Sequence, residues 1–356
     1  MAGLATLRRR QGGLTLIELM ISAAIGLTVV GALLVVYLGS RSAYRSSDSL
    51  ARVQEAGRFA IDFIAQDARM SSFMGCRSRS LTDDDETLVN ITSPAVTFAG
   101  ARDGMRGFEN GAGWTNPTAV ARAAGDVITF RRTAGMAVGI HANSDPVART
   151  VTLRHNAIGL GNGDLAVLSN CERALVFRVT NSPALTGIGS YPTVLEYKGT
   201  GGGVGGTLGN DTVIPVPTFN VGSRAEVMRF AETSYFIGNN AAGRPSLFRA
   251  SGSAVEELVE NIEDMDIVYG VDTTLPDADG VIDMYRRADQ VADWSRVVSA
   301  RISLLVVGPE DNVATASQTY VFRETTGDGV ADTQTSADRR LRHVFTTTVS
   351  LRNRVL

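Results

Sequence analysis

The sequence predicts an α+β protein in which one long N-terminal α-helix, transmembrane and then amphipathic, packs on a globular head rich in antiparallel β-sheet. Two observations lead to this fold class: an almost uncharged apolar run over residues 14–38, and, beyond residue 75, short segments of β-branched residues with a period of two. The 356 residues are enough to bury a sizeable core. The formal net charge of -3 provides no basic field for nucleic acid.

The predicted membrane segment covers residues 14–38. A helix rises roughly 1.5 Å per residue, so this run can cross a hydrocarbon core of about 30 Å. Residues 1–13 contain Arg8, Arg9 and Arg10 and no acid, which predicts a cytoplasmic leader and a head on the far side of the membrane. The run is longer than the apolar core of a signal peptide, about 7–15 residues, and no A-x-A-like site follows it. An ordinary signal anchor stays open, but it does not explain Glu18, the one charge in the run.

The residues around that charge carry a family resemblance. The stretch from Gly13 to Leu19, GLTLIEL, resembles the class III signal of type IV prepilins and pseudopilins. The resemblance implies that a prepilin peptidase cuts between Gly13 and Leu14, removes the leader 1–13 and methylates the new amine on Leu14. Glu18 then occupies the fifth mature position, where the family has a glutamate. Leu14 departs from the family's usual phenylalanine.

Glu18 is therefore predicted to act in assembly. An unpaired carboxylate in lipid is costly, and the amine of a neighbouring subunit would relieve that cost. Such a pair would set the axial register of each incoming subunit. In the alternative interpretation, Glu18 only lies at the level of the lipid headgroups.

Residues 39–75 predict an amphipathic continuation of the same helix, ending near Met74 with Gly75 as its C-cap. Apolar residues recur there at spacings of three and four, which indicates one apolar stripe. We expect this stripe to lie on the protein's own head rather than in a partner's groove. It comprises Leu50, Val53, Ala56, Phe59, Ala60, Phe63, Ile64, Met70 and Phe73.

Residues 76–356 predict the β-rich head, with a possible inserted subdomain around residues 81–220. Predicted strands cover residues 126–131, 165–168, 174–179, 193–197, 227–230, 233–237, 246–249, 262–269, 297–307 and 344–351. The two cysteines, Cys76 and Cys171, have no metal-ligand spacing. In a head outside the cytoplasm they predict one disulfide, and two separate buried thiols are the alternative.

The head carries a second resemblance. Residues 57–76, 260–272, 294–307 and 342–354 are similar to segments of PilW-type minor pilins. The resemblance implies a type IV pilus subunit that takes part in initiation of assembly and in a tip complex. Its implied partners are other minor and major pilins, the prepilin peptidase, the inner-membrane assembly platform and a tip adhesin. The implied location is a single-pass inner-membrane protein with a periplasmic head, then the pilus surface.

Two other functions stay open at this point. A J-type pseudopilin of a type II secretion system shares this layout, although such pseudopilins are usually shorter. A membrane-anchored adhesin would bind a surface through the middle region, where residues 81–220 match no pattern.

No catalytic constellation is present in the sequence. The three histidines, His141, His155 and His343, lack paired spacing, and there is no GxSxG motif, so we predict that the chain is not an enzyme. The pattern D-x-D-G-x-x-D formed by Asp277, Asp279 and Asp283 could supply oxygens to Ca²⁺. Acidic turns without any metal are the alternative.

Overall fold

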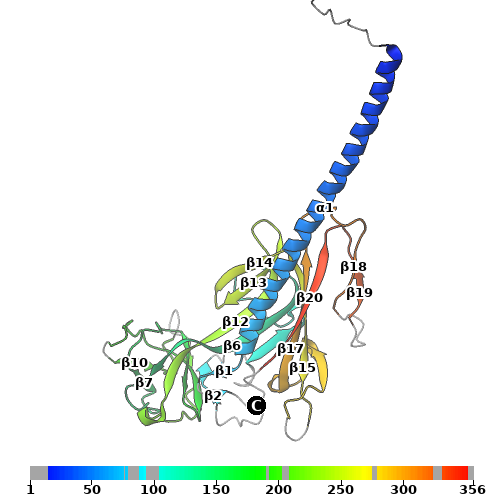
Figure 1. Ribbon diagram of the computed structural model, residues 1–356. Helices are drawn as coiled ribbons and strands as arrows, with labels where there is room; N and C mark the ends of the chain where they lie inside the picture. The colour runs from blue at the N-terminus through cyan, green and yellow to red at the C-terminus, as the bar shows by residue number, and fades with distance from the viewer. Residues whose placement is uncertain are drawn as a thin grey trace, which may run out of the picture.

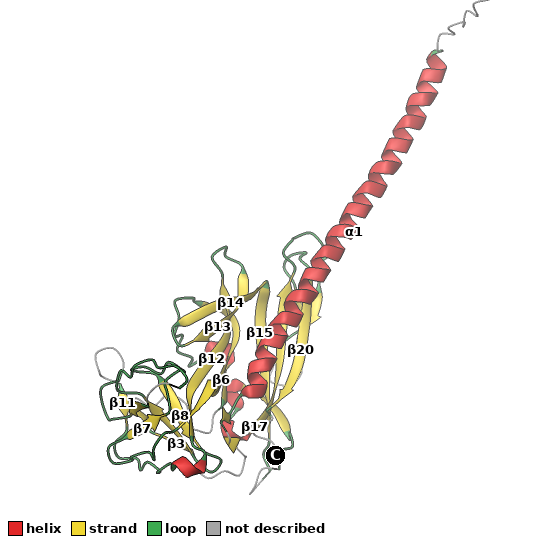
Figure 2. Cartoon of the chain, turned by 60° about the vertical axis from the view of Figure 1, so that its left-hand side comes forward, coloured by secondary structure: helices red, strands yellow, loops and turns green. Residues whose placement is uncertain are grey.

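The computed structural model describes residues 15–75, 77–78, 88–93, 104–189, 192–202, 208–274, 279–323 and 331–351. One long helix, α1 (Leu16–Met70), stands with its N-terminal half clear of the head and lays its C-terminal half along it (Figure 1). The head consists almost wholly of strands (Figure 2). The predicted fold class is confirmed.

Helix α1 ends four residues earlier than predicted. Ser71 is its C-cap, and Ser72 has a φ of 67° and donates its N–H to the carbonyl of Arg131 at 3.0 Å. The chain then forms a short hairpin of β1 (Phe73–Met74) and β2 (Arg77–Ser78). The prediction of Gly75 as the helix C-cap is wrong: Gly75 does adopt a φ of 91°, but it does so after β1, because the backbone has already joined the sheet.

The larger sheet has eight strands built around two long antiparallel ones, β6 (Arg122–Gly139) and β12 (Glu226–Asn239). One edge of β12 pairs with β6, and its other edge pairs first with β8 and then with β13. The two strands predicted at residues 227–230 and 233–237 are therefore one continuous strand. The remaining members are β3 (Leu88–Asn90), β5 (Met105–Phe108), β8 (Leu165–Ser169), β9 (Ala174–Arg178), β13 (Pro245–Ser251) and β14 (Ala254–Glu260).

The second sheet has four strands in the order β16-β15-β17-β20. Its strands are β15 (Ile262–Val271), β16 (Met284–Arg287), β17 (Val297–Val307) and β20 (Arg342–Ser350). Residues 297–307 were predicted as a strand with the bounds that the structure has. This sheet faces the C-terminal half of α1.

Short elements complete the described chain. Three further pairs are β4 (Thr92–Ser93) with β11 (Gly209–Asn210), β7 (Thr150–Leu153) with β10 (Thr193–Glu196), and β18 (Thr319–Val321) with β19 (Thr333–Thr335). The 3-10 turns are η2 (Glu109–Gly111), η4 (Val221–Ser223), η5 (Ala288–Gln290) and η6 (Trp294–Arg296).

The head contains two main hydrophobic clusters. The first joins α1 to both sheets through residues such as Ile64, Tyr235, Ile267 and Ile302. The second lies in the lobe that carries β7 and β10 (Figure 1), where Phe177 and Tyr197 pack with ring centroids 5.1 Å apart. Strands β6 and β12 contribute to both clusters. The second cluster spans Ile91 to Val227, close to the predicted insertion; whether that lobe is a separate subdomain stays a prediction.

Candidate assembly surface: helix α1 and its junction with the head

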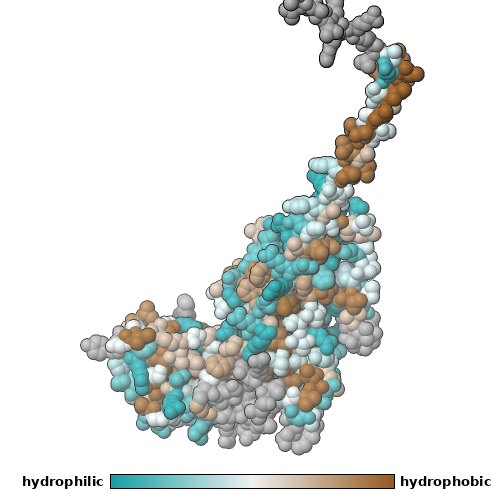
Figure 3. All heavy atoms as spheres, viewed as in Figure 1, coloured by the Kyte–Doolittle hydropathy of each residue, from teal (hydrophilic) through white to brown (hydrophobic). Residues whose placement is uncertain are grey.

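The N-terminal half of α1 has no protein around it. Its large apolar side chains are exposed, with Leu16 at 78%, Leu27 at 74% and Val35 at 72% of their full surface. They form a continuous hydrophobic column that projects from a mixed polar head (Figure 3). Within the described residues, α1 is the one helix long and apolar enough to cross a membrane. Burial of this column therefore requires a bilayer or other helices.

The first turn of α1 is closed by a capping box that the sequence analysis missed. The hydroxyl of Thr15 accepts from the N–H of Glu18 at 3.4 Å, and Glu18 Oε2 accepts from the N–H and the hydroxyl of Thr15 at 3.0 and 2.9 Å. The signal was present in the sequence as Thr-x-x-Glu before an apolar run. Glu18 therefore satisfies donors of its own chain at the position predicted to meet a neighbour. Gly13 and Leu14 lie outside the described residues, so their processing roles stay predictions.

The head meets α1 just beyond the membrane segment. The loop after β17 reaches the helix, where Glu310 forms an ion pair with Arg45 at 2.8 Å. Gly308 lies so close that a Cβ there would come within 2.4 Å of the Ser49 hydroxyl. Ser49 is the first buried residue of α1, which marks where the helix passes from an unpartnered to a packed segment.

The packed half of α1 contacts the sheet through small residues. A Cβ on Gly57 would come within 2.3 Å of the Phe345 ring on β20, and Ala60 and Ala68 are fully buried. The predicted stripe is correct at Val53, Ala60 and Ile64. It is wrong at four residues that remain exposed, which are Leu50, Phe59, Phe63 and Met70. They stay exposed because the helix backbone approaches the sheet through its small residues.

A buried charge fixes the end of the helix. Asp67 pairs with Arg132 of β6 at 2.8 Å and accepts from the hydroxyl of Tyr235 of β12 at 2.7 Å. Burial, and then the negative charge of Asp67, raise the pKa of Tyr235 well above its ordinary value, so Tyr235 stays a donor. Asp67 thus connects α1 to the two longest strands. In the sequence it resembles any polar helix residue, because its partners are distant.

The predicted disulfide would join two segments whose described neighbours lie close together. Cys171 lies in the turn between β8 and β9, while Cys76 lies outside the described residues. Its neighbour Gly75 packs against Ser169, and a Cβ on Gly75 would be 3.3 Å from that of Ser169. The chain thus approaches Cys171 immediately before Cys76, and the bridge itself stays a prediction.

The candidate calcium loop is held by turn hydrogen bonds. Asp279 accepts from the N–H of Val281 at 2.9 Å, and Asp283 accepts from the N–H of Thr273 at 2.6 Å. Asp272, which is fully buried, accepts from the N–H of Gly280 at 2.7 Å. Asp277 lies outside the described residues, among which no group of three His, Cys, Asp or Glu side chains could hold a metal. Calcium binding stays a prediction, and the turn alternative accounts for the bonds that Asp279 and Asp283 make.

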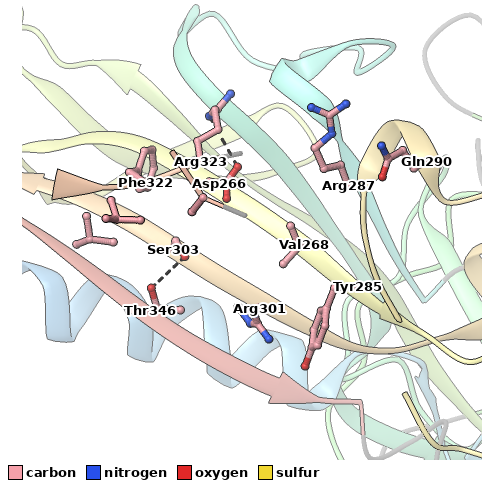
Figure 4. A pocket seen from close by; sticks show the side chains of 13 residues that line it. Asp266, Val268, Tyr285, Arg287, Gln290, Arg301, Ser303, Phe322, Arg323 and Thr346 are labelled. Atoms are coloured by element: carbon pink, nitrogen blue, oxygen red, sulfur yellow. Dashed lines mark hydrogen bonds and ion pairs between the residues drawn. The ribbon is translucent and has the colours of Figure 1, made fainter. Parts of the chain in front are cut away.

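The outer face of the four-stranded sheet carries a polar cavity of about 490 Å³ (Figure 4). The guanidinium of Arg301 lies 4.0 Å from the centre of the Tyr285 ring, and the Ser303 and Thr346 hydroxyls are 3.0 Å apart. These groups can hold a polar ligand, but they provide no activated nucleophile. In the described part of the chain, no histidine hydrogen-bonds to a serine or a cysteine, and His141, His155 and His343 lie on separate segments.

Beside this cavity lies a buried polar cluster that the sequence analysis did not predict. Arg323 donates to Asp264 at 3.1 Å and lies 3.7 Å from Asp266 and 3.9 Å from Asp126. Asp126 accepts from the backbone N–H of Ile267 at 2.9 Å, which connects β6 to β15. Glu109 lies near the cluster, and burial, followed by the charge of Asp126, raises its pKa to about 7. The cluster acts as a structural connection between the two sheets.

The long apolar helix and the strand-rich head have the layout of a pilin-type protein, and the helix is long and apolar enough to anchor it in a membrane. Comparison with known families agrees: residues 8–34 match the prokaryotic N-terminal methylation motif, and residues 234–353 match the type IV pilus-assembly protein W family. The second match begins within β12 and continues through β20, so it includes the whole four-stranded sheet. The chain is therefore a type IV pilin-like protein with a PilW segment and a prepilin-type N-terminus.

Among solved structures, the chain is similar to a type IV-like pilin from Thermus thermophilus. The two are 15% identical, the match covers 35% of this chain and 67% of the other, and the TM-score is 0.23. A search of curated proteins found no match.

Proposed function

We propose that this chain is a minor pilin that joins other pilins in a complex that initiates growth of a type IV pilus and remains at its tip. The observation that carries the proposal is the unpartnered apolar half of α1, which follows a prepilin-type methylation motif. An apolar column of this size is stable in a bilayer before assembly and among other pilin helices after it. The match to the PilW family supports a minor rather than a major subunit.

The proposed path starts with removal of residues 1–13 by a prepilin peptidase after Gly13. Leu14 then bears a free amine one residue before the capping box. In the filament, we propose, Glu18 gives up its two hydrogen bonds from Thr15 and pairs with the amine of a neighbouring pilin. The head lies in the periplasm, because Arg8, Arg9 and Arg10 favour the cytoplasmic side, and Cys76 and Cys171 form its disulfide there.

The first test is the mass of the N-terminal peptide, isolated from membranes of cells with an active prepilin peptidase. The expected peptide starts at N-methylated Leu14. A peptide that starts at Met1, or one cut beyond Leu38, would contradict the proposal. Gly13→Val should leave the unprocessed precursor in the membrane.

The second test concerns the machine. Deletion of the gene should remove surface pili and leave protein secretion intact. The opposite result, with secretion lost and pili retained, would assign the chain to a secretion pseudopilus.

A further inference from the structure

Two long strands end the sheets of the head, and they are built differently. Strand β14 (7 residues) ends the eight-stranded sheet, and β20 (9 residues) ends the four-stranded one. A free strand edge presents unpaired backbone groups, and soluble proteins usually protect such an edge with charge, proline or a bulge. An edge with these protections is therefore expected to stay unpaired, and an edge without them is available for pairing with another strand.

The edge at β14 is protected in two ways. It carries Glu256, Glu257 and Glu260, and its register with β13 shifts between Leu247 and Phe248. The charges repel an apolar strand, and the bulge twists the edge away from a flat partner. We expect no strand to add here.

The edge at β20 has neither protection. From Val344 to Ser350 it contains no charge, proline or glycine, and it pairs with β17 in unbroken register. Thr346, Thr348 and Ser350 are exposed. A flat, uncharged, β-branched edge of this length is the kind that other strands pair with.

The hydrogen bonds show which backbone groups are free. Leu351 donates its N–H to Val298 of the β17 side, whereas Arg342 donates its N–H away from β17, to Gln318 Oε1 at 2.6 Å. Because the direction alternates along a strand, the even-numbered residues point to the open edge. Beyond Arg342, these are Val344, Thr346, Thr348 and Ser350, and no described residue accepts from their N–H groups.

In the described part of the chain, nothing hydrogen-bonds to this edge beyond Arg342. Helix α1 packs on the face of β20, with Gly57 against Phe345. The β18–β19 hairpin lies beside the Arg342 end, where Val321 lines the same cavity as Val344 and Thr346. Figure 1 shows β20 between α1 and the β18–β19 hairpin. A second copy fits poorly: β20 runs alongside α1 (Figure 1), so two-fold antiparallel pairing of two β20 strands would point the two membrane helices in opposite directions.

We propose that β20 is an acceptor edge that pairs with an extended, uncharged segment of a different pilin-type subunit. The donor adds as a further strand of the four-stranded sheet, and backbone hydrogen bonds from Val344, Thr346, Thr348 and Ser350 hold it. The uncharged character of the edge selects a donor without charge, because a buried unpaired charge would be costly. The type of donor rests on the proposed function, whereas the acceptor edge does not.

The test uses the full chain in detergent micelles and a fluorescent eight-residue peptide of alternating valine and threonine. Binding is followed by fluorescence anisotropy. Two analogues carry backbone N-methyl groups, one on the odd and one on the even residues of the peptide. Strand addition uses one edge of the peptide, so one analogue should bind at least about tenfold more weakly than the unmodified peptide while the other binds normally.

Two protein variants locate the site. Thr348→Pro removes an outward N–H without touching the β17 ladder, and Thr348→Lys adds an edge charge; each should weaken binding by about tenfold or more. Val255→Lys on β14 is the matched control and should leave binding unchanged. Near-UV circular dichroism and the thermal midpoint verify that each variant folds.

Three outcomes would overturn the proposal: no binding of the unmodified peptide, equal binding of both methylated analogues, or unchanged binding to folded Thr348→Pro and Thr348→Lys proteins. None of these bears on whether residues 1–13 are removed or whether pili form. Failure of the edge is thus distinguishable from failure of the proposed function.

Discussion

The two halves of helix α1 are one continuous element that serves two different environments. Before Asp48, every described residue of the helix is exposed, and glycines such as Gly31 have nothing within 4 Å of an added Cβ. After Ser49, Gly57 lies against an aromatic ring and Asp67 is buried in an ion pair. The first half is specified by apolar composition and the second by individual contacts. Single substitutions should therefore act on the head mainly through the second half.

The largest expected effect comes from a pair of glycines, one in each half. In Gly57→Val the new side chain would overlap the Phe345 ring, which lies 2.3 Å from a Cβ there, so we expect a loss of about 3 kcal/mol in the free energy of unfolding of the head. The matched variant Gly31→Val should leave that free energy unchanged. Denaturant unfolding of the full chain in detergent, followed by tryptophan fluorescence, measures both. Equal effects of the two variants would remove the distinction between the halves.

The next effect concerns the buried end of α1. Asp67→Ala leaves Arg132 without its ion-pair partner and the Tyr235 hydroxyl with only its longer bond to the Phe63 carbonyl at 3.3 Å, which should cost about 2–3 kcal/mol. Asp62 lies one and a half turns earlier on the exposed side, and Asp62→Ala should change stability by less than about 0.5 kcal/mol. A loss for Asp67→Ala as small as that of the control would show that the ion pair does not hold the helix end.

The same contrast explains what the sequence could predict. The membrane half follows from its composition, and β17 follows from its apolar and β-branched residues, so both were predicted closely. The face of the packed half was predicted in part, because hydropathy gives weight to Leu50, Phe59 and Phe63, whereas the sheet is approached through Gly57, Ala60 and Ala68. The buried groups Asp67, Asp126 and Arg323 depend on partners far along the chain, which no local pattern reveals. Strand β14, with its run of glutamates, was missed because it lacks the alternation of a half-buried strand.

A smaller effect concerns pH: the stability of the head, but not that of the membrane half, should depend on it. The pKa of Glu109 is raised to about 7, chiefly by burial. Between about pH 4.5 and pH 7 the folded head therefore keeps a proton that the unfolded chain has lost, so stability falls as the pH rises through this range. Because Glu109 is only half-buried, solvent screening limits the loss to about 1 kcal/mol. Unfolding free energies at pH 5 and pH 8 measure it, and Glu109→Gln should remove this part of the slope. An unchanged slope in that variant would assign the pH dependence to other groups.

The smallest effect lies at the first turn of the membrane half, where Thr15 and Glu18 form the capping box. Thr15→Ala removes one cap, which should weaken this turn by about 1 kcal/mol and leave head stability unchanged. Faster amide exchange at Ile17 and Glu18 measures the effect, and Thr28→Ala, within the same half, is the control.

Glu18→Gln separates two roles of Glu18, because glutamine can also complete a capping box but carries no charge. If the first turn keeps its protection in Glu18→Gln while incorporation into pili is lost, the charge serves assembly and the cap serves the helix. If incorporation is retained, the membrane half needs no specific contact at Glu18, and composition alone is sufficient to specify it.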